Sequence, residues 1–242
     1  MLIARNISKM LGQKQVLTNV NASIIPGQIT ALIGPSGGGK STFLRTLSFL
    51  DPPDSGSIKV DDETFAFPNK NGNNRPFPWP KVTIVFQQLF LWPHLTIRQN
   101  ISLPGKDSND HRSTEIVDDL IEFFDLGEFA GRYPNQVSLG QRQRAAIVRA
   151  LALCPKYLLL DEITSALDVE HVSKLLTHIK SLRDKGMGIL LVTHLIGFAE
   201  RAADQVIFME SGSIVEAGGT ELLSSPKSKR LGQFLSLVGT AN

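Results

Sequence analysis

The chain has 242 residues, 42% hydrophobic and 20% charged, a balance that excludes wholesale disorder and fibrous repeats. Its net charge of +2 is too small for the footprint of a dedicated nucleic-acid binder, and its single cysteine excludes a disulfide framework and a cysteine-rich zinc site. No apolar run reaches the ~18 residues of a membrane helix, and the N-terminus lacks a secretory pattern. We therefore expect a chain that does not itself span a membrane.

The first third of the chain alternates apolar strand patterns with turn signals. The expected elements are a strand pair around Gly12, strands at 29–33, 57–60 and 82–86, and a helix at 41–50. Residues 68–80, rich in Pro and Asn, are predicted to form a loop, either a surface insertion or a functional segment.

From residue 96 onward, helix and strand periodicities alternate. Helices are expected at 96–130, 140–153, 169–185, 195–202 and 227–238, and strands at 157–161, 188–192, 206–209 and 213–216. This alternation predicts an α/β fold in which these strands form a parallel sheet with right-handed crossovers.

Residues 34–41, GPSGGGKS, match the phosphate-loop pattern G-x-x-x-x-G-K-[ST] between an apolar strand and a helix. Glycines let successive backbone N–H groups point at one phosphate, and the helix N-terminus adds positive potential. Lys40 is predicted to reach the β- and γ-phosphates, and Ser41 to supply a hydroxyl to Mg²⁺. The residues expected to bind the nucleotide in this loop are Gly34, Pro35, Ser36, Gly37, Gly38, Gly39, Lys40, Ser41 and Thr42.

A second apolar strand, residues 157–160, ends in Asp161 and Glu162. Beside a phosphate loop, such an Asp holds Mg²⁺ and the adjacent Glu is placed to act as general base on water. Without the loop, the same pair would read as two solvated charges at a strand end.

Further short segments follow in order: VFQQ at 85–88, VSLGQRQR at 137–144, SALD at 165–168 and VTH at 192–194. With the phosphate loop they resemble the ATP-binding-cassette (ABC) ATPases over essentially the whole chain. The resemblance implies that Gln87 contacts Mg²⁺ and the attacking water. It also implies that His194 contacts the γ-phosphate and orients Glu162.

The resemblance further implies a homodimer that sandwiches two ATP molecules. Ser138, Gly140 and Gln141 of the signature motif would cap the nucleotide of the opposite subunit, and Asp168 would close across the dimer. The implied fold is one domain over 1–242, a P-loop core (1–86 and 156–242) with an N-terminal antiparallel β subdomain. A helical subdomain, residues 87–155, would carry the signature.

The strings FQQLFLWPHLT (86–96), GFAE (197–200) and SPKSKRL (225–231) resemble the polar amino acid importer ATPases. The implied function is ATP hydrolysis that energises integral membrane permease subunits, at the cytoplasmic face of the inner membrane. An extracytoplasmic solute-binding protein would take part indirectly, and nucleic acid would not. Two alternatives stay open: a soluble ATP-driven clamp on nucleic acid, and a nucleotide-binding regulator that scarcely turns over.

Three residues depart from the family pattern: Leu139 stands where the signature has Gly, Ile163 where a Pro follows the acidic pair, and Leu11 where an aromatic stacks on adenine. Leu11 and Leu139 suggest weak adenine discrimination and slow hydrolysis as a hypothesis.

Other residues carry simpler expectations. Cys154 is expected to be buried, and His171 and His178 to lie on a solvated helix face. The apolar stretch 89–92 is either core or a groove for a permease helix.

Overall fold

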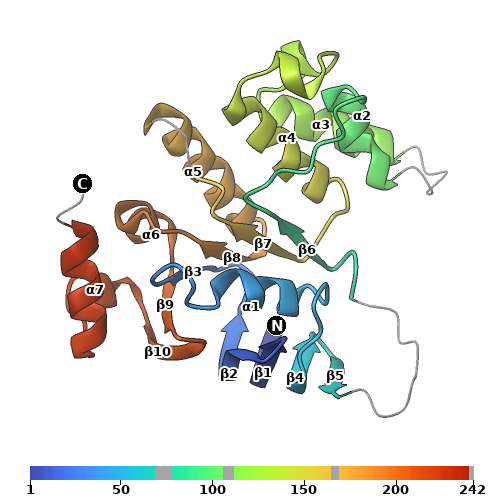
Figure 1. The fold of residues 1–242 in the computed structure, drawn as a ribbon. Coiled ribbons are helices and arrows are strands. Elements are labelled where there is room, and N and C mark those ends of the chain that lie inside the picture. The colour runs from blue at the N-terminus through green and yellow to red at the C-terminus, as the bar shows by residue number, and fades with distance from the viewer. Residues whose placement is uncertain (69–77, 106–111, 165–168, 240–242) are drawn as a thin grey trace.

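The computed structural model describes residues 1–68, 78–105, 112–164 and 169–239, and its strands form two sheets (Figure 1). The N-terminal sheet is antiparallel, in the order β2-β1-β4-β5. Its strands are β1 (Leu2–Leu11), β2 (Lys14–Ile24), β4 (Ser55–Val60) and β5 (Glu63–Phe67). The strand pair around Gly12 is thus confirmed, whereas β5 was not predicted. This short edge strand is defined by its pairing with β4, which the sequence pattern alone does not reveal.

The second sheet has six strands in the order β10-β9-β3-β8-β7-β6. They are β3 (Ile29–Ile33), β6 (Val82–Val85), β7 (Tyr157–Asp161), β8 (Gly188–Val192), β9 (Gln205–Glu210) and β10 (Ser213–Gly218). Five pair in parallel, among them β7, β8 and β9 as predicted, but β10 runs antiparallel to β9. The expectation was wrong for β10 because only Ser211 and Gly212 join the two strands, and a parallel connection needs a crossover of about a dozen residues or more.

The helices are α1 (Lys40–Leu47), α2 (Ile97–Ser102), α3 (Arg112–Phe123), α4 (Leu139–Leu151), α5 (Val169–Asp184), α6 (Ile196–Ala202) and α7 (Lys229–Gly239). In Figure 1, α1 lies between the two sheets, and α2, α3 and α4 gather in a separate helical lobe. The helical pattern over 96–130 is interrupted: α2 ends before a 3₁₀ turn at Leu103–Gly105, where Pro104 cannot continue the α-helical hydrogen bonds.

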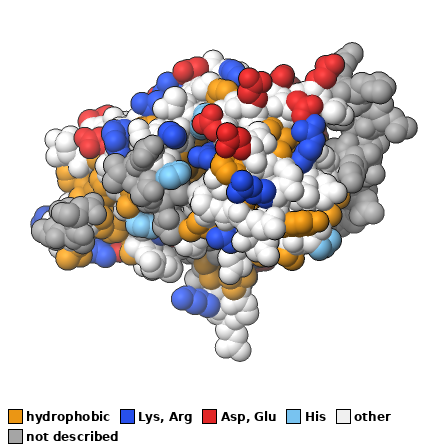
Figure 2. All heavy atoms as spheres, turned by 90° about the horizontal axis from the view of Figure 1, so that it is seen from above, with side chains coloured by type: hydrophobic (Ala, Val, Ile, Leu, Met, Phe, Trp, Pro, Cys, Tyr) orange, Lys and Arg blue, Asp and Glu red, His pale blue; other side chains and the backbone are white. Residues whose placement is uncertain are grey.

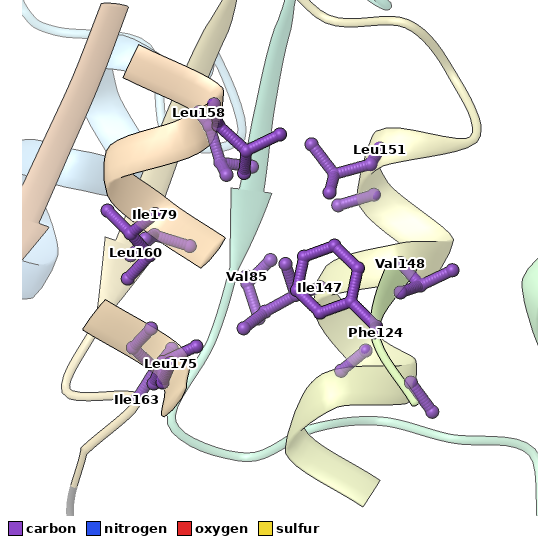
Figure 3. Packing of buried hydrophobic residues seen from close by; sticks show 14 of the residues in the cluster. Val85, Phe124, Ile147, Val148, Leu151, Leu158, Leu160, Ile163, Leu175 and Ile179 are labelled. Carbon is purple, nitrogen blue, oxygen red and sulfur yellow. The ribbon is translucent and has the colours of Figure 1, made fainter. Parts of the chain in front are cut away.

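Strand β7 is buried on both faces of the sheet, so its side chains alternate between two cores. Leu158 and Leu160 pack toward the helical lobe and α5, whereas Tyr157 and Leu159 pack toward α1 and the N-terminal sheet. Figure 3 shows the first core, where Ile147 of α4 reaches toward the strands. This packing holds the helical lobe against β6 and β7, close to the end of β7 where Asp161 and Glu162 lie.

Two simpler expectations are wrong. Cys154 is exposed, in a turn after α4 where its φ is +51°. The ring of His178 packs on Phe124 and Phe123, with centroid distances of 4.5 and 5.0 Å, and burial lowers its pKa. His178 therefore joins α5 to α3 rather than facing solvent.

Figure 2 views the molecule from above, and acidic and basic side chains are interspersed on this face. Within the described ranges, no helix combines the length and apolarity needed to cross a membrane.

Candidate functional site: the carboxyl ends of the parallel strands

Four neighbouring parallel strands, β3, β8, β7 and β6, end at one edge of the sheet. Their ends are level: Leu32 pairs with Val192, and Val192 with Asp161. The segments that follow these strands are the phosphate loop, the histidine segment, the acidic pair and the glutamine segment. In open α/β sheets this edge is where ligands bind.

The phosphate loop turns sharply between β3 and α1. Gly34 has a φ of +146°, and a Cβ there would lie 2.0 Å from the carbonyl oxygen of Met209. Gly39 precedes α1 with a φ of +99°, and a Cβ there would lie 2.9 Å from the carbonyl oxygen of Val16. Both positions therefore need glycine. Gly39 gives α1 no side-chain cap, so the N–H groups of its first turn are left for a ligand.

The side chain of Lys40 folds back over the loop. Its Nζ donates hydrogen bonds of 2.8 Å to the carbonyl oxygens of both Gly34 and Pro35. Burial lowers the pKa of Lys40, while the negative charges of Glu162 and Asp161 act in the opposite direction. At the tip of the loop, Ser36 and Gly37 are exposed. Gly38 is buried, and its carbonyl oxygen accepts a hydrogen bond of 3.0 Å from Gly212 N.

Asp161 is buried at the end of β7, and its Oδ1 accepts a hydrogen bond of 3.2 Å from Ser41 Oγ. Burial raises the pKa of this carboxyl, and the charge of Glu162 adds to the rise; Ser41, Lys40 and Arg45 oppose it. Ser41, Lys40 and Arg45 thus offset only part of the cost of burying the negative charge of Asp161, which favours a bound cation.

Glu162 follows in a left-handed conformation, with a φ of +49°, and its backbone N–H donates to Val192 O at 3.1 Å. Its Oε2 lies 3.9 Å from Nδ1 of His194, longer than a hydrogen bond. The side chain of His194 is half exposed just after β8, and that of Glu162 is one quarter exposed, so both are accessible from solvent.

Gln87 is exposed just beyond β6, and it lines a cavity of about 410 Å³ together with Asp161. Arg45 and Phe90 line the same cavity. The structure therefore brings Gln87 to the same cavity as Asp161. Arg45 was missed because nothing marks it in the sequence beyond its place in α1.

The signature residues lie apart from this cluster, at the start of α4 in the helical lobe (Figure 1). Ser138 Oγ accepts from Gln141 N at 3.2 Å, and Gln141 Oε1 accepts from Ser138 N at 2.8 Å. This reciprocal pair is a capping box. Gly140 is buried in the first turn. Asp168 lies outside the described residues.

The three departures have distinct settings. Leu139 is the first residue of α4, where backbone φ is negative for any L-residue, so the helix does not require glycine there. Ile163 is buried in the core beside Leu175 (Figure 3). Leu11 is 48% exposed at the end of β1.

The last residue of the predicted phosphate-binding set, Thr42, is half-buried in α1.

Two further contacts support the site without any sequence signal. Thr193 Oγ1 accepts from Leu195 N at 3.0 Å and lies 3.4 Å from Thr164 Oγ1, which ties the histidine segment to the residues after Glu162. Arg149 of α4 donates to two carbonyl oxygens beside Gln87's segment. Tertiary packing creates both contacts.

A profile described as "ABC transporter" matches residues 17–165. The arginine transport ATP-binding protein ArtM of Bacillus subtilis (strain 168) is 41% identical, over 98% of this chain and 100% of that protein. The glutamine transport ATP-binding protein GlnQ of Escherichia coli (strain K12) is 39% identical, over 98% of this chain and 100% of its own length.

Among solved structures, the dimeric cassette MJ0796 in a post-hydrolysis state bound to ADP and Pi has a TM-score of 0.78 at 30% identity. The match covers 91% of this chain and 99% of that one. A nucleotide-free cassette at 22% identity, covering 96% of this chain and 98% of its own, has a TM-score of 0.82, which supports the fold. The chain therefore belongs to the ABC transporter family, as an ATP-binding, ATP-hydrolysing subunit.

Proposed function

We propose that this subunit energises the uptake of a polar amino acid through a membrane permease, from the cytoplasmic face of the inner membrane. Relatives 36–41% identical over nearly the whole chain are named for transport of arginine, glutamine, glutamate or cystine. The strings at 86–96, 197–200 and 225–231 support the same subfamily.

The observation that carries the catalytic proposal is the convergence of Lys40, Asp161, Glu162 and His194 at the ends of β3, β7 and β8. Lys40, now bonded to loop carbonyls, would turn to the phosphates and stabilise the charge that develops on them. Glu162 would accept the proton of the attacking water, and His194 would orient Glu162 and contact the γ-phosphate.

The residues that would hold Mg²⁺ are Ser41, Gln87 and Asp161. All three offer oxygen atoms, the ligands this ion prefers, and the Ser41–Asp161 hydrogen bond already holds two of them together. Mg²⁺ usually keeps several waters and binds one or two protein ligands together with substrate phosphates, so this small set of oxygen ligands suits it. Bound Mg²⁺ would neutralise negative charge on the phosphates.

We propose a homodimer in which Ser138, Gly140, Gln141 and Asp168 of one chain complete the nucleotide site of the other. The separation of α4 from the phosphate loop within one chain supports this arrangement. The buried cluster shared by α4 and the parallel strands supports one domain over 1–242, with 1–86 and 156–242 as core and 87–155 as the helical signature subdomain.

The contact surface for the permease would be the apolar stretch 89–92. Phe90 is 62% exposed and Trp92 50% exposed, whereas Leu89 and Leu91 pack on the core. One side of the stretch thus belongs to the core, and the other side is open to a partner, so each of the two roles considered from the sequence has support. A solute-binding protein would take part indirectly, and no role for nucleic acid is proposed.

The test is a co-purification. A tagged Glu162→Gln variant is trapped with ATP in the source cell, membranes are solubilised gently, and bound proteins are identified. A stoichiometric multi-span membrane protein is the expected result. Soluble proteins or nucleic acid alone, with the chain absent from membranes, would contradict the transport role and favour a soluble clamp.

A further inference from the structure

The segment from Gln87 to Trp92 follows β6 as a loop and lines part of the site. Gln87 and Phe90 line the cavity that contains Asp161. Phe90 has a φ of +46°, an unfavourable conformation for a bulky residue. Such a segment needs external contacts to stay in one place.

Those contacts come from two side chains of the helical lobe, the buried Asn100 and the half-buried Arg149. Asn100 of α2 holds the far end, where its Oδ1 accepts from Trp92 N at 2.7 Å and its Nδ2 donates to Trp92 O at 3.0 Å. Arg149 holds the end nearer Gln87. Its two terminal nitrogens each donate a 2.7 Å hydrogen bond, one to Leu89 O and the other to Phe90 O.

The Arg149 contact is unusual because the guanidinium binds carbonyl oxygens rather than an acid. Among the described residues, no carboxylate forms an ion pair with it, and burial lowers its pKa while leaving it charged. Two short bonds to adjacent carbonyls use the planar fork of Arg, and Lys cannot reproduce that geometry. Loss of the fork would leave both carbonyls without these donors.

Arg149 lies in the last turn of α4, whose first turn carries the signature residues. A helix is stiff over this length, so movement at one end is transmitted to the other. We infer that Arg149 is a positioning residue: it clamps the Leu89–Phe90 backbone to α4 and thereby sets Gln87 at the site. The inference rests on the proposed role of Gln87.

Two readouts test the clamp in the full-length chain, in a Trp79→Phe background that leaves Trp92 as the only tryptophan. Acrylamide quenching of Trp92 reports whether the segment is held, without any need for activity. Steady-state hydrolysis and equilibrium binding of Mg-ATP separate kcat from nucleotide affinity. The variants are Arg149→Met, Arg149→Lys and, as control, Arg98→Met, which removes the same charge from an exposed ion pair with Asp118 in the same lobe.

Arg149→Met should increase Trp92 quenching and lower kcat by about tenfold or more, with ATP affinity within about threefold, because a small displacement of a positioned group is costly to rate. Arg149→Lys should recover part of the rate, since one donor can still reach one carbonyl. Arg98→Met should match the background chain, because exposed pairs contribute little.

An unchanged kcat in Arg149→Met would overturn the inference. A fall in ATP affinity in parallel with a lowered melting temperature would show that Arg149 only stabilises the fold, which also overturns it. If the background chain failed to hydrolyse Mg-ATP, the proposed function would fail instead. Quenching would then still decide the clamp, and unchanged Trp92 quenching would refute it.

Discussion

Helices α1 and α4 differ in how the N–H groups of their first turns are satisfied. Helix α1 begins after Gly39 with no side-chain cap, whereas α4 begins with Ser138 and Gln141 capping each other. The first terminus is prepared for a phosphate, and the second is complete in the isolated chain. Under the proposed function, the difference means that nucleotide would bind to the phosphate loop of one chain, whereas the signature would exchange its internal hydrogen bonds for contacts to a partner's nucleotide.

The largest expected effect is on the α1 side of this comparison. Glu162→Gln should lower hydrolysis by about 10²- to 10⁴-fold, because the proposed general base is lost, while Mg-ATP binding to the phosphate loop persists. Phosphate release and equilibrium binding measure the two. The control is Glu200→Gln on the exposed face of α6. Weakened binding in proportion to rate would show that Glu162 holds nucleotide rather than activating water.

On the α4 side, Ser138→Asp separates capping from catalysis. Asp caps a helix as well as Ser, so the melting temperature should stay near that of the wild type. Its charge would repel the partner's γ-phosphate, so hydrolysis should fall by about 10²-fold, the scale of one lost transition-state contact. By contrast, Ser138→Ala should cost about 1 kcal/mol of unfolding free energy. Full activity in Ser138→Asp would remove the signature from the site.

Asp161→Asn should stabilise the nucleotide-free chain by roughly 1–3 kcal/mol while impairing Mg²⁺-dependent hydrolysis, because it removes a buried charge. The raised pKa means that the folded chain binds this proton more tightly than the unfolded chain. Stability should therefore fall as pH rises from the ordinary aspartate range through the raised pKa, and level off above it. Denaturant unfolding across acidic pH measures this slope, which the variant should lose. An identical slope in both chains would contradict the assignment.

The smallest expected effect concerns Leu139. Leu139→Gly should raise hydrolysis severalfold if the side chain crowds the partner's nucleotide, at a stability cost of about 0.5–1 kcal/mol for glycine in a helix. ATP and GTP turnover in both chains also test whether Leu11 leaves base selection weak. A wild-type rate equal to that of the variant, with strong ATP preference, would reject the hypothesis.

The contrast between the two termini also explains what the sequence could reveal. The phosphate loop is local in sequence: its glycines, Lys40 and Ser41 lie within residues 34–41, so the whole motif can be recognised in one short segment. Strand β7 was recognisable because burial on both faces gives a continuous apolar run. Its acidic end was therefore predictable as well.

Contacts between distant segments were not predictable. Arg149 meets Phe90 across 59 residues, and His178 meets Phe124 only because α5 packs on α3. The antiparallel β10 is different, since the two-residue connection after β9 carried a usable signal. Propensity and periodicity describe single elements, whereas these sites depend on how elements pack together.

The central claim, that each nucleotide site is shared between two chains, can be tested by complementation. Lys40→Met disables the phosphate loop and leaves the signature intact, and Ser138→Asp does the reverse. Each variant alone should be nearly inactive. Their mixture should recover hydrolysis well above the sum of the two, because a mixed dimer contains one intact site made from both chains. No recovery, in a mixture shown to form mixed dimers, would contradict the shared site.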